Sequence, residues 1–130
     1  QIQGRSRHLL YLDDEAMLVE LVHDLFESLG YRVTGYTRAT EALSAVRADP
    51  GGFDVVVTDY NMPGMSGLEV AQAVSRLRAD LPVVLVSGYL SPTVHAAALA
   101  AGIKEIVSKP TLLQQLGDVV ARLLDTPPRA

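Results

Sequence analysis

Hydrophobic residues along this chain follow two patterns that alternate from end to end. Short apolar runs predict strands, and between them apolar residues recur every three or four positions, as on one face of a helix. Five strands are predicted, over residues 8–12, 32–36, 54–58, 82–86 and 105–109. Because strictly alternating strands and helices form parallel sheets with helical crossovers, the chain is predicted to be a doubly wound α/β domain.

Helix start and stop signals bracket the predicted helices. The first ends before Gly30 and is expected to bury an apolar stripe formed by Leu18, Leu21, Val22, Leu25 and Leu29. Ser66 and Glu69 form a capping-box pattern at the start of the third, and Ser91 before a proline is a good N-cap for the fourth. Residues 111–114 repeat the capping-box pattern before the last helix.

The apolar content of the strands predicts their places in the sheet. Residues 55–57 and 83–86 are continuously apolar, like central strands buried on both faces, whereas residues 32–36 alternate like an edge strand. In doubly wound sheets, ligands bind at the carboxyl ends of the strands. Candidate functional residues are therefore expected at those ends.

Length and composition limit the classes of function. The 130 residues carry 15 acidic and 11 basic side chains, which fits one domain with a formal charge of -4. The absence of Cys excludes disulfides, Cys-ligated zinc, iron–sulfur clusters and thiol nucleophiles. The apolar runs are far shorter than the roughly 20 residues of a membrane span, and no basic groove is evident, so neither a membrane nor a nucleic acid is expected as a partner.

The polar ends of the chain set the expected domain limits. Residues 1–7 are interpreted as a linker, residues 8–125 as the domain and residues 126–130 as a tail. The chain does not begin with Met, which leads us to expect that it was cut from a longer protein.

Polar residues cluster where the predicted strands end. They are Asp13, Asp14 and Glu15 after the first strand, Asp59, Tyr60 and Asn61 after the third, Ser87 and Gly88 after the fourth, and Lys109 and Pro110 at the fifth. Carboxylates at one rim repel each other, by about 4 kcal/mol per pair at about 4 Å and an effective dielectric of about 20. Mg2+ is expected to offset this repulsion, because it prefers oxygen ligands and is held by one or two carboxylates.

Asp59 is the predicted reactive carboxylate. It follows a buried apolar strand and precedes a turn-rich loop, residues 61–64, that leaves its side chain at the rim. A carboxylate can accept a phosphoryl group as a nucleophile if a metal and a fixed cation neutralise the charge in transit. Lys109 would supply the cation, and the Ser87 hydroxyl would donate a hydrogen bond to a phosphoryl oxygen.

Four motifs at these strand ends resemble those of the receiver domain of two-component response regulators. They are residues 12–15 (LDDE), 57–67 (VTDYNMPGMSG), 86–88 (VSG) and 108–110 (SKP). The resemblance implies a flavodoxin-like (βα)5 fold with strand order 2-1-3-4-5. It implies that Asp59 takes a phosphoryl group from a phosphohistidine on a histidine kinase or a histidine phosphotransfer protein. It also implies that Mg2+ is held by Asp13, Asp14, Asp59 and the backbone carbonyl of Asn61.

The same resemblance assigns a switch, and here the sequence departs from the family pattern. Ser87 would be the switch hydroxyl, and the peptide bond before Pro110 would be cis. The positions of Asn61 and Tyr89 would tune the lifetime of the phosphate. Ile106 stands where an aromatic switch residue is usual, although by itself it is an ordinary core residue of an edge strand. We therefore expect phosphoacceptance to be intact and the coupling of the hydroxyl to an aromatic ring to be altered.

Residues 87–110 look more like receivers of hybrid sensor histidine kinases than like those fused to DNA-binding domains. The parent chain is therefore expected to be a hybrid kinase with this domain in the cytoplasm. The resemblance also implies that the domain promotes its own phosphorylation and dephosphorylation without being a turnover enzyme. The fourth helix, fifth strand and last helix form a face that family members use for partners, and it is the candidate face for a weak homodimer.

Two other functions are alternatives. A haloacid-dehalogenase-like, Mg2+-dependent phosphohydrolase also uses an aspartate after an apolar strand, but it needs a second acid two residues further on, where this chain has Asn61. A non-phosphorylated scaffold receiver is suggested only by the missing aromatic residue.

Each motif also has a plain structural interpretation. Residues 13–15 could cap the first helix, residues 87–88 could form a turn, and residues 109–110 could end a strand. The joint order of the motifs favours the phosphoacceptor over these interpretations. No ligand spacing links the three histidines, which are interpreted as surface residues: His8, His23 and His95.

Overall fold

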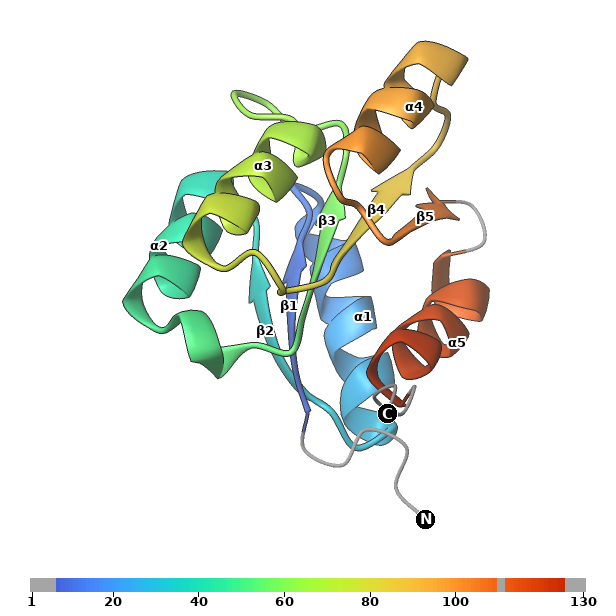
Figure 1. Ribbon diagram of the computed structural model, residues 1–130. Coiled ribbons are helices and arrows are strands. Elements are labelled where there is room, and N and C mark those ends of the chain that lie inside the picture. Colours follow the sequence, from blue (N-terminus) through green and yellow to red (C-terminus); the bar gives the residue numbers. More distant parts are fainter. Residues whose placement is uncertain (1–6, 110–111, 126–130) are drawn as a thin grey trace.

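In the computed structural model, which describes residues 7–109 and 112–125, a five-stranded parallel sheet lies between two layers of helices (Figure 1). The strands are β1 (His8–Leu12), β2 (Arg32–Tyr36), β3 (Val55–Asp59), β4 (Val83–Ser87) and β5 (Glu105–Ser108). The helices are α1 (Ala16–Ser28), α2 (Ala39–Ala48), α3 (Gly67–Leu77), α4 (Pro92–Ala100) and α5 (Leu112–Asp125), with a short 3-10 turn, η1 (Pro50–Gly52). The strand order, β2-β1-β3-β4-β5, confirms the predicted doubly wound α/β fold.

Two strands end one residue later than predicted, and both shifts concern functional candidates. In the ladder between β3 and β4, Asp59 is paired with Val86, and between β4 and β5, Ser87 is paired with Ser108. Asp59 and Ser87 are therefore the last residues of their strands rather than the first residues of the loops. β5 ends one residue earlier than predicted, so Lys109 lies just beyond the sheet.

The two faces of the sheet carry separate hydrophobic cores. On one face, Leu10 and Leu85 belong to a core that α2, α3 and α4 complete (Figure 1). On the other face, Tyr11 and Val57 belong to a core that α1 and α5 complete. Ile106 is half-buried against the first of these cores, which agrees with its interpretation as a core residue of an edge strand.

The helix ends follow the capping signals. Gly30 and Gly102 have positive φ values of 94° and 92°, which glycine adopts without strain at the end of a helix. Ser66 forms the predicted capping box with Glu69, and the Ser91 side chain accepts a backbone N–H from the first turn of α4. These contacts confirm the predicted starts of α3 and α4.

Two predictions fall outside the described residues. The predicted cis peptide bond involves Pro110, and the predicted capping box of the last helix begins at Thr111. The helix that follows is present as α5, and its Leu116 and Val120 are completely buried. No described helix is both long and apolar enough to cross a membrane.

The buried face of α1 differs from the predicted stripe. Val22 and Phe26 are buried, whereas Leu21, which the stripe included, is 47% exposed. The predicted stripe spans more of the helix circumference than the sheet covers, so its edge stays in water. The surface of α1 therefore carries an apolar residue that packing within the domain does not use.

His8 is half-buried, so its interpretation as a surface residue is wrong. Its ring nitrogens lie 2.8 Å from the carbonyl oxygen of Gly52 and 2.7 Å from the hydroxyl oxygen of Thr34, and the ring packs against Phe53. These contacts join β1, β2 and η1 at the amino edge of the sheet, opposite the carboxyl edge that carries the acidic residues.

Candidate functional site

Three aspartates meet at the carboxyl edge of the sheet. Asp13 and Asp14 follow β1, and Asp59 ends β3, which is paired with β1. One carboxylate oxygen from each of the three lies within 4.8 Å of the others. Asp13 is completely buried and Asp59 is 2% exposed, whereas Asp14 is exposed. The structure thus brings together the carboxylates that the sequence placed at one rim.

Lys109 supplies positive charge to this cluster. Its Nζ lies 3.2 Å from Asp59 Oδ2, 3.3 Å from Asp13 Oδ2 and 3.2 Å from Glu15 Oε1. Burial alone would lower the pKa of Lys109, but the charges of Asp13 and Asp59 outweigh burial and raise the pKa above its ordinary value. The ammonium group is therefore a permanent cation shared by three carboxylates.

Asp13 is held by groups on both of its oxygens. Oδ1 accepts the backbone N–H of Glu15 at 2.9 Å, and Oδ2 accepts the Tyr11 hydroxyl at 3.1 Å and faces Lys109. The first contact lies at the N-cap of α1, where the Glu15 side chain makes no capping hydrogen bond of its own. Capping of the first helix therefore accounts for only one of the contacts of Asp13.

Burial raises the pKa of both buried carboxyl groups. Desolvation is the main cause for Asp59, whose pKa rises to about 6; the charge of Asp13 adds to the rise, while Lys109 and the backbone N–H of Asn61 oppose it. Burial likewise raises the pKa of Asp13. Keeping both groups charged therefore costs free energy, and a further cation would offset part of that cost.

The donor set fits a hard divalent cation. Carboxylate oxygens are preferred ligands of Mg2+, which keeps several of its waters and needs only one or two carboxylates from the protein. The exposed Asp14 leaves one side of the cluster in contact with solvent. Lys109 is a single cation that faces more than one carboxylate, so negative charge remains for a metal cation to offset. Asp13, Asp14 and Asp59 can therefore hold Mg2+.

Gly67 lets α3 begin directly against the end of β3. Its N–H donates to the carbonyl oxygen of Tyr60 at 2.9 Å. A Cβ at this position would collide with the backbone carbonyl of Asp59 and would lie 2.7 Å from Leu85 Cδ1. The loop after Asp59 is thus fixed at its far end by a contact that only glycine permits.

Ser87 reaches the same edge of the sheet, but its hydroxyl is engaged elsewhere. Ser87 is 6% exposed, and its hydroxyl donates to the carbonyl oxygen of Tyr89 at 3.0 Å, as in a turn. The Tyr89 side chain is 79% exposed. The hydrogen bond predicted for Ser87 therefore requires the hydroxyl to leave its present acceptor.

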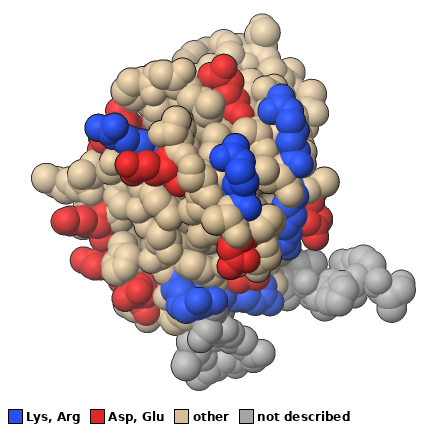
Figure 2. Space-filling model, turned by 90° about the vertical axis from the view of Figure 1, so that its left-hand side faces the viewer, with Lys and Arg blue, Asp and Glu red and all other residues tan. Residues whose placement is uncertain are grey.

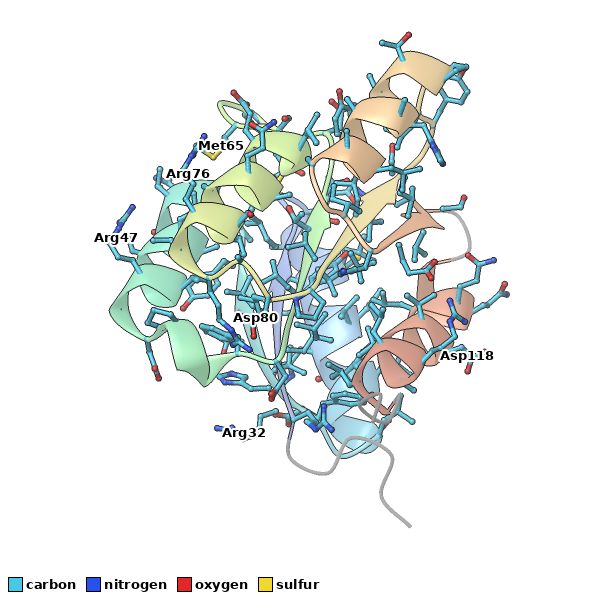
Figure 3. The ribbon with its side chains drawn as sticks, viewed as in Figure 1. Arg32, Arg47, Met65, Arg76, Asp80 and Asp118 are labelled. Atoms are coloured by element: carbon cyan, nitrogen blue, oxygen red, sulfur yellow. The ribbon has the colours of Figure 1, made fainter. Side chains whose placement is uncertain are left out.

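An open hollow of about 610 Å³ lies beside the aspartates. Asp14 lines it together with residues 37–40 at the start of α2 and residues 62–65 of the loop before α3. Figure 3 places Met65 of that loop near the amino end of α3. A reactant can therefore approach the aspartates from the side where Asp14 is exposed.

Among the residues that the structure describes, two that contact the site were not among the predicted site residues. Tyr11 binds Asp13, and Glu15 binds Lys109. Tyr11 could have been found from strand periodicity, because residues two apart on a strand point to the same face. Glu15 was noted at the end of the first strand, but nothing in the sequence indicates which cation it meets.

Comparisons with known proteins agree on one family. The family model of the response regulator receiver domain matches residues 9–121. The two-component response regulator ARR2 of Arabidopsis thaliana is 32% identical over 111 residues, and the sensor histidine kinase GacS of Pseudomonas protegens is 28% identical over 126 residues. The solved structure of response regulator TrrA from Thermotoga maritima, in complex with Mg2+-BeF, is 30% identical with a TM-score of 0.78 and covers 91% of this chain and 99% of its own.

The curated relatives are much longer than the region they share with this chain. The match covers 85% of this chain but 17% of ARR2, and 93% of this chain but 14% of GacS. The shared region is thus a small part of a larger protein in both relatives.

Proposed function

Because the chain belongs to the response regulator receiver domain family and is thus a receiver domain of two-component systems, we propose that Asp59 is its phosphoacceptor. The phosphoryl donor is a phosphohistidine on a histidine kinase or a histidine phosphotransfer protein. Phosphorylation of Asp59 then changes the affinity of the domain for its partners. The proposed unit is residues 8–125.

One observation carries this proposal. Asp59 is almost completely buried, has Asp13 and Asp14 within 4.8 Å and is bound by Lys109 at 3.2 Å. Such a group of carboxylates and one fixed cation suits phosphoryl transfer, in which catalysis consists largely of positioning and neutralising charge.

The reaction uses few groups of the protein. An oxygen of Asp59 forms the new P–O bond while the P–N bond to the histidine breaks, and the imidazole nitrogen leaves with the bonding pair and gains a proton from solvent. Lys109 offsets the charge of the phosphoryl oxygens, and Ser87 donates a hydrogen bond to one of them. Mg2+ bound by Asp13, Asp14, Asp59 and the Asn61 carbonyl would supply further positive charge.

The surface near the site supports a protein as the phosphoryl donor. Met17 is 74% exposed and Leu21 is 47% exposed on α1, next to the acidic residues that precede the helix. Together with residues 15, 16 and 18, they line a shallow hollow of about 440 Å³. Apolar residues exposed together favour docking of a helix from the donor.

The charge on one face of the domain supports the proposal that this domain does not bind nucleic acid. Basic and acidic side chains are interspersed over the face that carries α2 and α3 (Figure 2). Binding to a phosphate backbone requires basic side chains gathered on one face.

Acetyl phosphate tests the proposed reaction without knowledge of the donor. Wild-type protein incubated with Mg2+ and acetyl phosphate should gain the mass of one phosphoryl group, about 80 Da. Asp59→Asn should gain none. Asp118→Asn, at an exposed aspartate on the outer side of α5 (Figure 3), should be labelled like the wild type and serves as the matched control.

Three results of this experiment would contradict the proposal. A wild-type protein that gains no mass would favour the non-phosphorylated scaffold over a phosphoacceptor. Full labelling of Asp59→Asn would show that another residue accepts the phosphoryl group. Sustained release of phosphate over many turnovers would favour the hydrolase alternative over a receiver.

The wider setting of the domain is also a proposal. The match to GacS over 93% of this chain supports a hybrid sensor kinase as the parent protein, with the domain in the cytoplasm. The α4–β5–α5 face is proposed for a weak homodimer, supported by Leu99 on α4, which is 53% exposed. Sedimentation of phosphorylated and unphosphorylated protein tests the dimer; equal masses at all concentrations would exclude it.

A further inference from the structure

Tyr11 joins the hydrophobic core to the acidic site. It lies in β1 two residues before Asp13, which follows the strand, and the hydrogen bond between them shows that the two side chains point the same way. The ring is completely buried in the core formed with α1 and α5, which also contains Phe26 and the paired residue Val57. Its hydroxyl lies at the edge of this apolar core and donates a hydrogen bond to Asp13 Oδ2 at 3.1 Å.

The hydroxyl is the one uncharged side-chain donor that the described contacts give to Asp13. Oδ1 accepts a backbone N–H from Glu15, and the other group on Oδ2 is the ammonium of Lys109. Lys109 faces Asp13, Asp59 and Glu15 at 3.2–3.3 Å, so three carboxylates share its charge. Among the described contacts, the Tyr11 hydroxyl donates to Asp13 alone.

We propose that Tyr11 is a positioning residue for the divalent-cation site, whose hydroxyl fixes the buried Asp13 carboxylate in the orientation that binds Mg2+. This inference rests on the proposed function, because it takes the aspartate cluster to be the cation site. Donors that orient metal-binding side chains contribute strongly to affinity, and their removal typically weakens metal binding about 10-fold to 100-fold.

Tyr11→Phe isolates the hydroxyl, because the phenyl ring keeps the core filled. We expect the dissociation constant for Mg2+, measured by calorimetry without any phosphoryl donor, to increase about tenfold. Labelling by acetyl phosphate should slow at limiting Mg2+ and return close to the wild-type rate at saturating Mg2+. A change in the maximal rate alone would contradict the positioning role.

A core variant provides the matched control. Phe26→Leu removes volume from the same core, and no described contact joins Phe26 to the aspartates. It should lower the melting temperature and leave the Mg2+ dissociation constant within about twofold of the wild type. If Tyr11→Phe behaves in the same way, Tyr11 is only a core residue and the proposal is overturned.

A measurement on the wild-type protein covers the case in which Tyr11→Phe does not fold. Protein labelled with 13C at tyrosine Cζ reports hydrogen bonding of each hydroxyl, and the Tyr11 resonance is assigned by Tyr→Phe variants at the other four tyrosines. Mg2+ should shift the Tyr11 resonance with the same midpoint as calorimetry. A resonance that ignores Mg2+ would overturn the proposal.

The experiments also separate this inference from the proposed function. Wild-type protein that binds Mg2+ but is not labelled by acetyl phosphate would remove the phosphoacceptor and leave the role of Tyr11 standing. If the wild type is labelled and Tyr11→Phe binds Mg2+ as tightly as the wild type, only the proposed role of Tyr11 is overturned. A wild-type protein that does not bind Mg2+ would overturn both.

Discussion

The buried carboxyl group of Asp59 makes the stability of the domain depend on pH. Its pKa in the folded protein is about 6, against about 3.9 in an unfolded chain. Between about pH 4 and pH 6 the folded state therefore binds a proton that the unfolded state has lost, so stability falls as pH rises through this window. Two pKa units correspond to an upper bound of about 3 kcal/mol.

Replacing Asp59 by Asn should remove this penalty. In metal-free buffer, Asp59→Asn should be more stable than the wild type above about pH 7, and the two should converge near pH 4. Urea unfolding across this range measures the difference, with Asp118→Asn as the exposed control. A variant that is no more stable than the wild type above pH 7 would show that burying the charged Asp59 carboxylate costs no stability.

At the residue scale, the sequence predicted which carboxylates meet but not how each is held. The place of Asp59 follows from its position at the end of an apolar strand, and that of Lys109 from the order of the strands. Strand periodicity indicates that Tyr11 points toward Asp13, but the hydrogen bond that it makes and the present acceptor of Ser87 depend on side-chain torsions, which no residue pattern specifies.

At the scale of elements, the start of α3 connects helix stability to the site. The Ser66 side chain accepts the N–H of Glu69 at 3.2 Å, and the Glu69 side chain accepts the N–H of Ser66 at 2.9 Å. The next residue, Gly67, contacts the backbone at the end of β3. Fraying of this first turn would therefore loosen the loop that follows Asp59.

Ser66→Ala should destabilise the domain by about 1 kcal/mol, because an N-cap side chain is lost. Thermal unfolding measures the effect, and Ser75→Ala, at an exposed position within α3, is the control that should cost nothing. Equal stability of Ser66→Ala and the wild type would mean that solvent replaces the cap fully.

The limits of the elements were predicted to within a residue where a specific residue type marks them. Gly30, Ser66 and Ser91 each have a local role that the sequence displays. β3 extends to Asp59 and β4 to Ser87 because these residues pair with a neighbouring strand. Local sequence patterns do not contain this pairing, so the prediction ended both strands one residue early. The exposure of Leu21 likewise depends on how α1 packs against the sheet.

At the scale of the whole molecule, strands distant in sequence share one cation site. Asp13 and Asp14 follow β1, Asp59 ends β3 and Lys109 follows β5. Because the unfolded chain does not hold these groups together, a cation that binds them stabilises the folded state by mass action. The alternation of strands and helices predicted this convergence, whereas the strand order came from the family resemblance.

Mg2+ should therefore raise the melting temperature of the wild type. At ten times its dissociation constant, the expected stabilisation is about 1.4 kcal/mol. Differential scanning calorimetry with and without Mg2+ measures it, and a chelator should reverse it. Asp59→Asn should respond less than the wild type, and an equal response would place the cation elsewhere.

The contact between the Ser87 hydroxyl and the Tyr89 carbonyl limits what this loop can do at one time. A serine hydroxyl donates one hydrogen bond. It can therefore bind either the Tyr89 carbonyl or a phosphoryl oxygen on Asp59, but not both at once. When it changes acceptor, the carbonyl must turn to water or to another donor. The conformation of the segment between β4 and α4 therefore depends on which acceptor the Ser87 hydroxyl binds.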